Sequence, residues 1–392
     1  MNDVREKITG ILPAIRMLLS GNEPINCRII LPDKIPLKDM QKYSGRILKY
    51  HKLQGDTEED ITEQLKHNDM EIPGYLYSAN LGLICCAHTK AEADLLYLNA
   101  IRIFNNEQIE HIPLSIAKGK IKNKITIITG AAQGFGRGIA KDLFAEGANI
   151  IIADLNEEAG KALEVELNDN NRFNRALFVK TDVSDPDSVA YLVSKTVAEF
   201  GGLDVMISNA GVLRAGGLDE MDPSTFEFMT KVNYSGYFYC AKYASAVMKT
   251  QNKYAKDHYA DIIQINSKSG LKGSRKNFAY AGGKFGGIGL TQSFALELIP
   301  YKIKVNSICP GNFFDGPLWS DPEKGLFVQY LNTGKVPGAK TIQEVKEFYE
   351  AQVPAGRGCE VRDVTRAILY VIEQEYETGQ AIPVTGGQNM LS

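Results

Sequence analysis

The chain has 392 residues, of which 44% are hydrophobic and 23% charged, a balance that predicts a folded protein with a sizeable core and argues against disorder. Its formal net charge of -3 argues against a general nucleic-acid or anionic-membrane binder, which is normally basic. No uncharged apolar run reaches the roughly 20 residues that cross a bilayer, the first residues do not resemble a secretory signal, and the six cysteines lack metal-finger or CxxC spacing. We therefore expect a cytoplasmic protein with reduced thiols, no metal, and no nucleic-acid or membrane partner.

Residues 1–118 are predicted to form a small α/β or α+β domain. The string "LGLICCA" predicts a strand, and Thr89 and Glu92 have capping-box spacing at the start of the helix that follows. The histidines of this part form no HxH pair, so a catalytic metal site is not expected. We interpret the domain as non-catalytic and as a contributor to assembly, joined to the rest of the chain by "IEHIPLSIAKGKIKN".

Residues 119–392 show a different pattern, in which short runs rich in Ile and Val alternate with segments of helix length. The runs are "KITIITG", "ANIIIADL", "RALFVKTDV", "LDVMISNAG", "DIIQINS" and "IKVNSICPG". Such runs are typical of buried parallel strands joined by crossover helices. One of these helices is expected in "DPDSVAYLVSKTVAEFGG", with Asp185 or Ser184 as its cap and Gly201 at its end. The pattern predicts a doubly wound parallel sheet of the Rossmann type.

A glycine-rich loop follows the first of these runs. Gly130, Gly134 and Gly136 lie between a predicted strand and a predicted helix. Glycine lets the backbone approach a pyrophosphate closely, and the helix N-terminus offers free N–H groups. The alternative, a tight turn without a ligand, is disfavoured because Asp154 ends the next strand, where a carboxylate can accept hydrogen bonds from the adenosine ribose. That carboxylate would repel a 2'-phosphate and Leu155 follows it instead of an Arg, which favours NAD over NADP.

Further motifs show that the chain from about residue 122 resembles the short-chain dehydrogenase/reductase family. They are "NAG" at 209–211, Asn233, Ser267, the pair Tyr280 and Lys284, and "PG" at 310–311. The resemblance implies a catalytic tetrad of Asn233, Ser267, Tyr280 and Lys284, and a homo-oligomer, expected to be a homotetramer. It also implies a set of cofactor-binding residues: Gly130, Gln133, Gly134, Phe135, Gly136, Asp154, Asp182, Val183, Asn209, Ala210, Gly211, Tyr280, Lys284, Pro310 and Gly311.

The residue types of the tetrad suit the oxidation of an alcohol. A phenol with an ordinary pKa near 10 is a poor base at neutral pH, so Lys284, on the same helical face, is expected to lower the pKa of Tyr280 and to bind the nicotinamide ribose. Ser267 is expected to hold the substrate oxygen, and Asn233 to anchor a relay water. A Tyr and a Lys four residues apart are commonly just an exposed pair, but Ser267, 13 residues upstream, favours catalysis. The five glycines of "YAGGKFGGIG" predict a loop by propensity, whereas the resemblance implies a helix, with close approach of the cofactor or of a partner's helix.

A basic cluster between Ser267 and Tyr280 suggests an anionic substrate. No acidic residue occurs from Ile262 to Leu296, and charge-assisted hydrogen bonds to phosphate are strong. We expect Lys268, Lys272 or Arg275 to contact substrate. The alternative is that these side chains face water. Asn312 is a further candidate substrate residue, and residues 311–357 are expected to cover the site.

Longer strings narrow the substrate class. The segment "IIQINSKSGLKGSRKNFAYAGGKFGGIGLTQSFALEL" and the terminal "TGQAIPVTGGQNML" resemble bacterial sorbitol-6-phosphate 2-dehydrogenases, a group within the same family. This resemblance implies oxidation of D-sorbitol 6-phosphate to fructose 6-phosphate with NAD. The alternatives are a dehydrogenase for an unphosphorylated polyol or another hydroxyl substrate, and a non-catalytic nucleotide-sensing regulator, against which the complete tetrad argues.

Overall fold

The computed structural model describes most of the chain. The described residues are 2–21, 23–35, 49–55, 57–66, 70–111, 118–169, 171, 173–255, 257–273, 275–323, 325–332, 334 and 336–390. The central residues of the expected linker, 112–117, lie outside these ranges. Among the described residues, no helix combines the length and the apolar character needed to span a membrane.

A small mixed sheet forms in the first part of the chain. Its strand order is β1-β4-β3-β2, with β1 and β3 antiparallel to β4 and β2 parallel to β3. The capping box predicted for Thr89 and Glu92 is confirmed at the start of α4. The elements of this part are α1 (Asn2–Ser20), β1 (Asn26–Ile30), β2 (Tyr50–Lys52), α3 (Glu58–Leu65), β3 (Gly74–Ser78), β4 (Gly82–Ala87) and α4 (Lys90–Phe104).

The larger sheet is the predicted doubly wound parallel sheet. Its seven strands have the order β11-β10-β9-β8-β5-β6-β7, and neighbouring strands are parallel throughout. They are β5 (Ile125–Thr129), β6 (Asn149–Asp154), β7 (Ala176–Lys180), β8 (Val205–Ser208), β9 (Ala260–Ile265), β10 (Ile303–Pro310) and β11 (Ala381–Val384). Sequence reasoning missed β11, a four-residue strand that contains Pro383 and lies at the edge of the sheet, where a missing N–H is tolerated.

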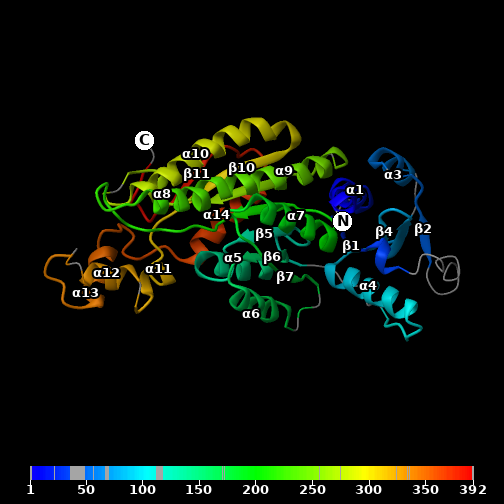
Figure 1. The fold of residues 1–392 in the computed structure, drawn as a ribbon, viewed down its shortest axis with the longest axis horizontal. Helices are drawn as coiled ribbons and strands as arrows, with labels where there is room; N and C mark the ends of the chain where they lie inside the picture. The colour runs from blue at the N-terminus through cyan, green and yellow to red at the C-terminus, as the bar shows by residue number, and fades with distance from the viewer. Residues whose placement is uncertain are drawn as a thin grey trace.

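Helices cover both faces of this sheet (Figure 1). On one face lie α7 (Pro186–Phe200), α9 (Gly236–Lys253) and α10 (Phe278–Leu298), and on the other lie α5 (Gly134–Ala145), α6 (Glu157–Asn168) and α14 (Val361–Glu373). The predicted ends of α7 are confirmed: Asp185 accepts from the N–H of Asp187, and Gly201 ends the helix with a φ of 93°. The remaining helices are α8 (Pro223–Thr230), α11 (Pro317–Ser320), α12 (Leu326–Asn332) and α13 (Ile342–Glu350).

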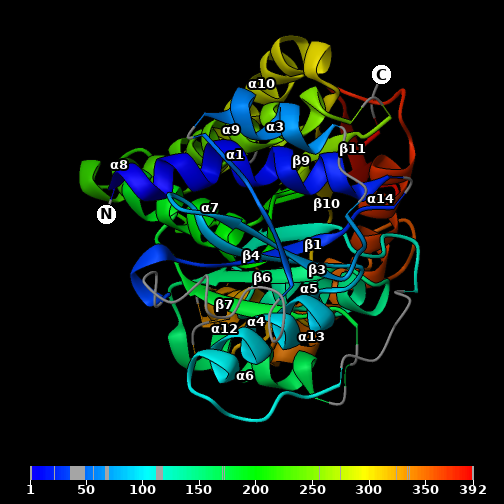
Figure 2. The ribbon, with the colours of Figure 1, turned by 90° about the vertical axis from the view of Figure 1, so that its right-hand side faces the viewer.

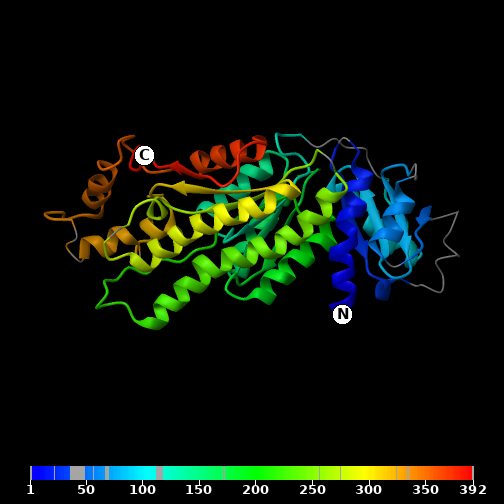
Figure 3. The same cartoon turned by 90° about the horizontal axis from the view of Figure 1, so that it is seen from above.

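The N-terminal region and the cover lie at opposite ends of the large sheet. Figures 1 and 3 show α1 to α4 at one end and α11 to α13 at the other. Helix α1 packs against α7 and α9 and crosses them in Figure 2. One continuous apolar core runs through this contact, from Ile11 and Ile15 of α1 to Val193 and Phe200 of α7. The small sheet is therefore joined to the large one by buried apolar surface.

A buried ion pair crosses the same contact. Arg16 of α1 and Asp204, just before β8, are both 0% exposed, and the guanidinium donates to both carboxylate oxygens at 2.9 Å. Asp204 also accepts from the N–H of Ile125 at 2.8 Å and lies 3.2 Å from the ring of His258. Burial alone would raise the pKa of Asp204, but Arg16 and His258 hold that pKa well below its ordinary value. Asp204 is therefore buried as a carboxylate, and α1 supplies its countercharge.

Replacing Arg16 by Leu should lower the free energy of unfolding by about 3 to 5 kcal/mol, because it leaves a buried carboxylate without its cation. Urea denaturation of the full chain measures this loss. The control is Lys122→Ala, which removes an exposed ion pair with Glu23 and should cost less than about 1 kcal/mol. A loss for Arg16→Leu no larger than that of the control would show that α1 does not stabilise the sheet through this pair.

Candidate functional site

The glycine-rich loop joins β5 to α5 with the geometry of a phosphate cradle. Gly130 has a φ of 64° and Gly134 a φ of 57°, a region that glycine adopts without strain. A Cβ on Gly136 would lie 2.1 Å from the carbonyl oxygen of Gly130, so only glycine fits where the loop meets the helix. Gln133, at the N-cap of α5, makes no side-chain cap hydrogen bond, which leaves the first N–H groups of the helix for a ligand.

Asp154 lies at the carboxyl end of β6, beside this loop. Its two carboxylate oxygens accept hydrogen bonds from the N–H groups of Ala132 and Asn156, each at 2.9 Å. The side chain of Leu155, the next residue, is 61% exposed. The loop therefore holds Asp154 in a fixed orientation, and the residues fit a dinucleotide whose pyrophosphate meets the glycines and whose ribose meets the carboxylate.

The other predicted cofactor residues lie at the same edge of the sheet. Asp182 and Val183 follow β7, and residues 209–211 follow β8. Pro310 ends β10, and Gly311 follows it. Asn209 ties two of these loops together, because its side-chain amide donates to the carbonyl oxygens of Thr129 and Gly130 at 2.8 and 3.1 Å. The parallel order of the strands gathers these residues, since all carboxyl ends then share one edge.

The four residues of the predicted tetrad come from three neighbouring segments. Ser267 follows β9, Tyr280 and Lys284 lie one turn apart on α10, and Asn233 lies in a π-helical turn, Lys231–Ser235, before α9. The hydroxyl of Ser267 lies close enough to Tyr280 to lower the pKa of its phenol, and the ammonium of Lys284 lies 5.6 Å from the ring centre of Tyr280. The tetrad predicted from sequence is thus gathered in one place.

Asn233 is held by the backbone. Its side-chain oxygen accepts from the N–H of Val212 at 2.9 Å, and its amide donates to the carbonyl of Val212 at 2.8 Å. A Cβ built on Gly211 would lie 3.1 Å from the Asn233 oxygen and 3.8 Å from the Lys284 nitrogen. Asn233 and Lys284 therefore approach the same short stretch of backbone after β8. The two hydrogen bonds of Asn233 with Val212 hold this loop, which carries three predicted cofactor residues.

Burial sets the charge state of the Tyr-Lys pair. Lys284 is 4% exposed, and burial lowers its pKa to about 8. Burial raises the pKa of Tyr280, and the hydrogen bond with Ser267 only partly offsets this effect. The expectation that the pKa of Tyr280 would be lowered is therefore wrong for this structure: the cost of burying a phenolate outweighs the stabilisation that its neighbours provide.

The structure separates the basic side chains of the cluster. Lys268 is partly buried, its ammonium donates to the Oε1 atom of Gln388 at 3.1 Å, and burial lowers its pKa. Lys272 and Arg275 are exposed, and Lys276 forms an exposed ion pair with Glu220 at 2.6 Å. Among the described residues no carboxylate pairs with Lys268, and of these basic side chains it is the partly buried one, next in the chain to Ser267.

Sequence reasoning did not assign a role to the residues near the C-terminus that meet Lys268. Gln388 accepts from its ammonium, and the side chain of Asn389 donates to its carbonyl oxygen at 3.5 Å. Gln388 and Asn389 also line a cavity of about 410 Å³ together with Asn312 and Gly311. The string "TGGQNM" gave no chemical signal for this role, because only the fold brings it beside Ser267.

The glycines of the Tyr-Lys segment lie within helix α10, as the resemblance implied. A Cβ on Gly286 would lie 2.7 Å from the ring of Tyr234, and one on Gly287 would lie 2.3 Å from the side-chain amide of Gln264. A Cβ on Gly282 or Gly289 would meet no atom within 4 Å. Two of the glycines therefore make room for side chains of this chain, and two face open space.

The expected cover has an apolar core of its own. Phe314, Trp319, Phe327 and Val345 are buried together. Phe313 stacks on Phe135 of the glycine-rich loop, with ring centres 4.5 Å apart. The cover therefore contacts the loop that is predicted to hold the cofactor.

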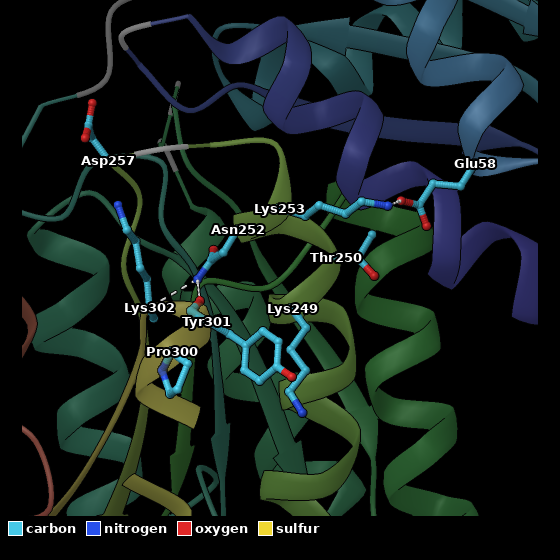
Figure 4. A pocket seen from close by; sticks show the side chains of 9 residues that line it. All are labelled: Glu58, Lys249, Thr250, Asn252, Lys253, Asp257, Pro300, Tyr301 and Lys302. Atoms are coloured by element: carbon cyan, nitrogen blue, oxygen red, sulfur yellow. Dashed lines mark hydrogen bonds and ion pairs between the residues drawn. The ribbon is translucent and has the colours of Figure 1, made fainter. Parts of the chain in front are cut away.

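A larger groove lies at the opposite edge of the sheet, away from every predicted site residue. It has a volume of about 740 Å³ and includes Glu58, Lys249, Lys253 and Lys302. The three ammonium groups point in different directions (Figure 4): Lys253 pairs with Glu58 at 2.9 Å, whereas Lys249 and Lys302 lie over tyrosine rings. These cations do not converge on one position, and we place the candidate site at the carboxyl edge instead.

Comparisons with known proteins agree with this geometry. Sorbitol-6-phosphate 2-dehydrogenase from Escherichia coli is 34% identical over 271 residues, which are 69% of this chain and all of that protein. Trans-4-hydroxycyclohexanecarboxylate dehydrogenase from Sinomonas cyclohexanicum is 32% identical over 70% of this chain and 96% of its own length. The crystal structure of sorbitol-6-phosphate 2-dehydrogenase SrlD from Erwinia amylovora superposes with a TM-score of 0.62 at 36% identity, over 68% of this chain and all of that one.

A family model described as "short chain dehydrogenase" matches residues 124–319. This range contains the glycine-rich loop, Asp154 and the four residues of the predicted tetrad. The chain is an oxidoreductase of the short-chain dehydrogenase/reductase family.

Proposed function

We propose that this enzyme oxidises the hydroxyl group of a sugar-alcohol phosphate with NAD, and that its substrate is D-sorbitol 6-phosphate, which gives fructose 6-phosphate. Two similar proteins carry the name sorbitol-6-phosphate 2-dehydrogenase. The single observation in this chain that carries the proposal is Lys268, a partly buried cation next to Ser267 that has no carboxylate partner among the described residues. A substrate phosphate would supply that countercharge.

The proposed chemistry follows from the positions of the tetrad. Bound NAD supplies a nicotinamide ring that accepts hydride. Ser267 holds the substrate oxygen by a hydrogen bond, and the phenolate form of Tyr280 takes the hydroxyl proton as the carbonyl forms. The Lys284 ammonium donates to the carbonyl oxygen of Ile265 at 2.9 Å, which keeps its charge near the phenol. Because burial raises the pKa of Tyr280, its phenol must first release its own proton. The base is the phenolate form, whose fraction rises with pH.

Replacing Lys268 by Ala should raise the KM for sorbitol 6-phosphate by about 10- to 100-fold, since a charge-assisted hydrogen bond contributes about 1.5 to 3 kcal/mol. The KM for sorbitol should hardly change. Initial rates of NADH formation measure both. Lys276→Ala, which removes an exposed cation that already has a carboxylate partner, is the control.

Three other results would redirect the proposal. Equal effects of Lys268→Ala on both substrates would favour an unphosphorylated polyol. A better turnover of trans-4-hydroxycyclohexanecarboxylate would favour a carboxylate substrate, as in the second relative. A strong effect of Lys272→Ala with none of Lys268→Ala would move the anchor to the exposed lysine.

We propose NAD rather than NADP because the carboxylate of Asp154 is held at the end of β6 by two backbone N–H groups. A 2'-phosphate at this position would meet a fixed negative charge at close range.

Replacing Asp154 by Ser should therefore reduce the preference for NAD over NADP by at least about tenfold, as the loss of one short-range repulsion of about 1.4 kcal/mol implies. The ratio of kcat/KM values for the two cofactors is the measurement. Glu157→Gln removes an exposed charge nearby, at the start of α6, and should leave the ratio unchanged. An unchanged ratio in Asp154→Ser would show that Asp154 does not select the cofactor.

We also propose that the chain forms a homo-oligomer through the outer face of α9 and α10, which run side by side (Figure 3). Phe238, Phe285 and Leu296 on these helices are 41%, 46% and 80% exposed. The open positions of Gly282 and Gly289 would let the helix of a second copy approach closely. A homotetramer needs a second contact. The edge strand β11 could provide it, because one side of an edge strand has unpaired backbone groups.

Introducing Glu at Leu296 should therefore dissociate the oligomer toward a monomer of 43.2 kDa, because a charge would be buried in the contact. Size-exclusion chromatography with light scattering gives the mass. The control is Val165→Glu on α6, which replaces a similarly exposed side chain (71%) on the opposite face of the sheet. This variant should leave the mass of the oligomer unchanged. A monomeric unmodified protein, or the same mass for Leu296→Glu, would rule out this face.

A further inference from the structure

Asn266 lies between two residues of the proposed tetrad and is 4% exposed. Its side-chain oxygen accepts from the N–H of Ser267 at 2.8 Å. Its amide nitrogen donates to the carbonyl oxygen of Lys284 at 2.9 Å. One planar side chain thus joins the loop after β9 to the helix α10 at the two residues whose separation sets the geometry of the reaction.

Asn266 is also the end of a buried hydrogen-bond chain. Its amide donates to the Oε1 atom of Gln264 at 2.7 Å, and Ser307 of β10 bonds the same oxygen at 3.0 Å. Ser307 is 2.7 Å from the hydroxyl of Thr291 on α10, which is 3.0 Å from the hydroxyl of Tyr237 on α9. Each of these four further side chains is at most 1% exposed. The chain therefore links two strands and two helices behind the proposed tetrad.

Two glycines make room for this chain. A Cβ on Gly287 would lie 2.3 Å from the Gln264 amide, and one on Gly270 would lie 2.2 Å from the Asn266 oxygen and 3.1 Å from the Lys284 carbonyl oxygen. Buried polar groups are costly unless they are hydrogen-bonded, and a glycine inside a helix costs roughly 1 kcal/mol relative to Ala. A purely apolar packing of β9 against α10 would avoid both costs.

We infer that Asn266 is a positioning residue, which fixes Ser267 relative to Lys284 and is itself oriented by the chain from Gln264 to Tyr237. This inference rests on the proposed roles of Ser267, Tyr280 and Lys284. Asn266 touches neither the substrate nor the cofactor in this proposal. It acts through the backbone of the two residues that it joins, and a displacement of about 1 Å between reacting groups can cost about 100-fold in rate.

The test compares two buried asparagines on neighbouring strands. Asn306 of β10 is 1% exposed and also joins two backbone groups, the carbonyl oxygen of Glu377 and the N–H of Gln380, at 2.8 and 3.0 Å. It contacts no residue of the proposed tetrad. Both Asn266→Ala and Asn306→Ala should lower the melting temperature, but only Asn266→Ala should lower kcat, by about 10- to 100-fold.

The pH profile of kcat/KM gives a readout that a loss of stability alone does not change. The groups that face the phenol of Tyr280 and the ammonium of Lys284 are Ser267 and the buried thiol of Cys309 on β10, whose pKa burial raises to about 12. If Asn266→Ala lets Lys284 move from Tyr280, the phenolate loses stabilisation, and the apparent pKa of the base should rise. The profile of Asn306→Ala should match that of the unmodified enzyme.

Two further variants make the outcomes distinguishable. Should Asn266→Ala fail to fold, Gly270→Ala displaces the same side chain and is expected to give the same loss of kcat. Tyr280→Phe reports on the tetrad itself: if it retains full activity, the proposed function of the tetrad fails. If Tyr280→Phe is inactive while Asn266→Ala and Asn306→Ala have the same kcat and pH profile, the tetrad stands and the positioning role is overturned.

Discussion

The parallel alignment of seven strands is the constraint on which the rest of the structure depends. In such a sheet all strands run in the same direction, so their carboxyl ends lie together on one side. Loops that are far apart in sequence therefore meet there, at what we call the carboxyl edge. Asp154 ends a strand of this sheet, and the glycine-rich loop, the loop after β8, Ser267 and Gly311 follow other strands of it. The amino edge is left for a different purpose, and there Asp204 meets Arg16 of the N-terminal region.

Buried charges at the amino edge and at the carboxyl edge differ in their partners. At the amino edge Asp204 has a guanidinium and a backbone N–H as partners and stays ionised. At the carboxyl edge the acceptors of Lys284 and Lys268 in the described part of the chain are neutral, a backbone carbonyl and a glutamine, and burial lowers the pKa of each. A paired buried charge stabilises the fold, whereas a cation without a counterion is suited to meet a ligand.

The N-terminal region shares a core with the dehydrogenase sheet and lies at the opposite end from the cover and the proposed tetrad. It supplies a countercharge to the sheet and apolar side chains to α7 and α9. These contacts tie it to the amino ends of the parallel strands. Helix α9 extends from its contact with α1 to the π-helical turn that carries Asn233.

The alternation of strands and helices and the family could be predicted from the sequence, because alternating apolar runs, glycine spacing and the Tyr-Lys pair are local patterns with direct physical causes. The same patterns led to the proposed cofactor loop and tetrad. The sequence did not predict β11, the Arg16–Asp204 pair, the contact of Gln388 with Lys268, or the chain that ends at Asn266. These features join residues that are far apart in the chain. A single Asn, Gln or Arg is not part of a periodic pattern, so its hydrogen-bond partner cannot be predicted from the sequence. The partners of the buried polar groups depend on tertiary packing. Each such group needs a hydrogen bond, and it forms one with the groups that the packing of the elements places next to it.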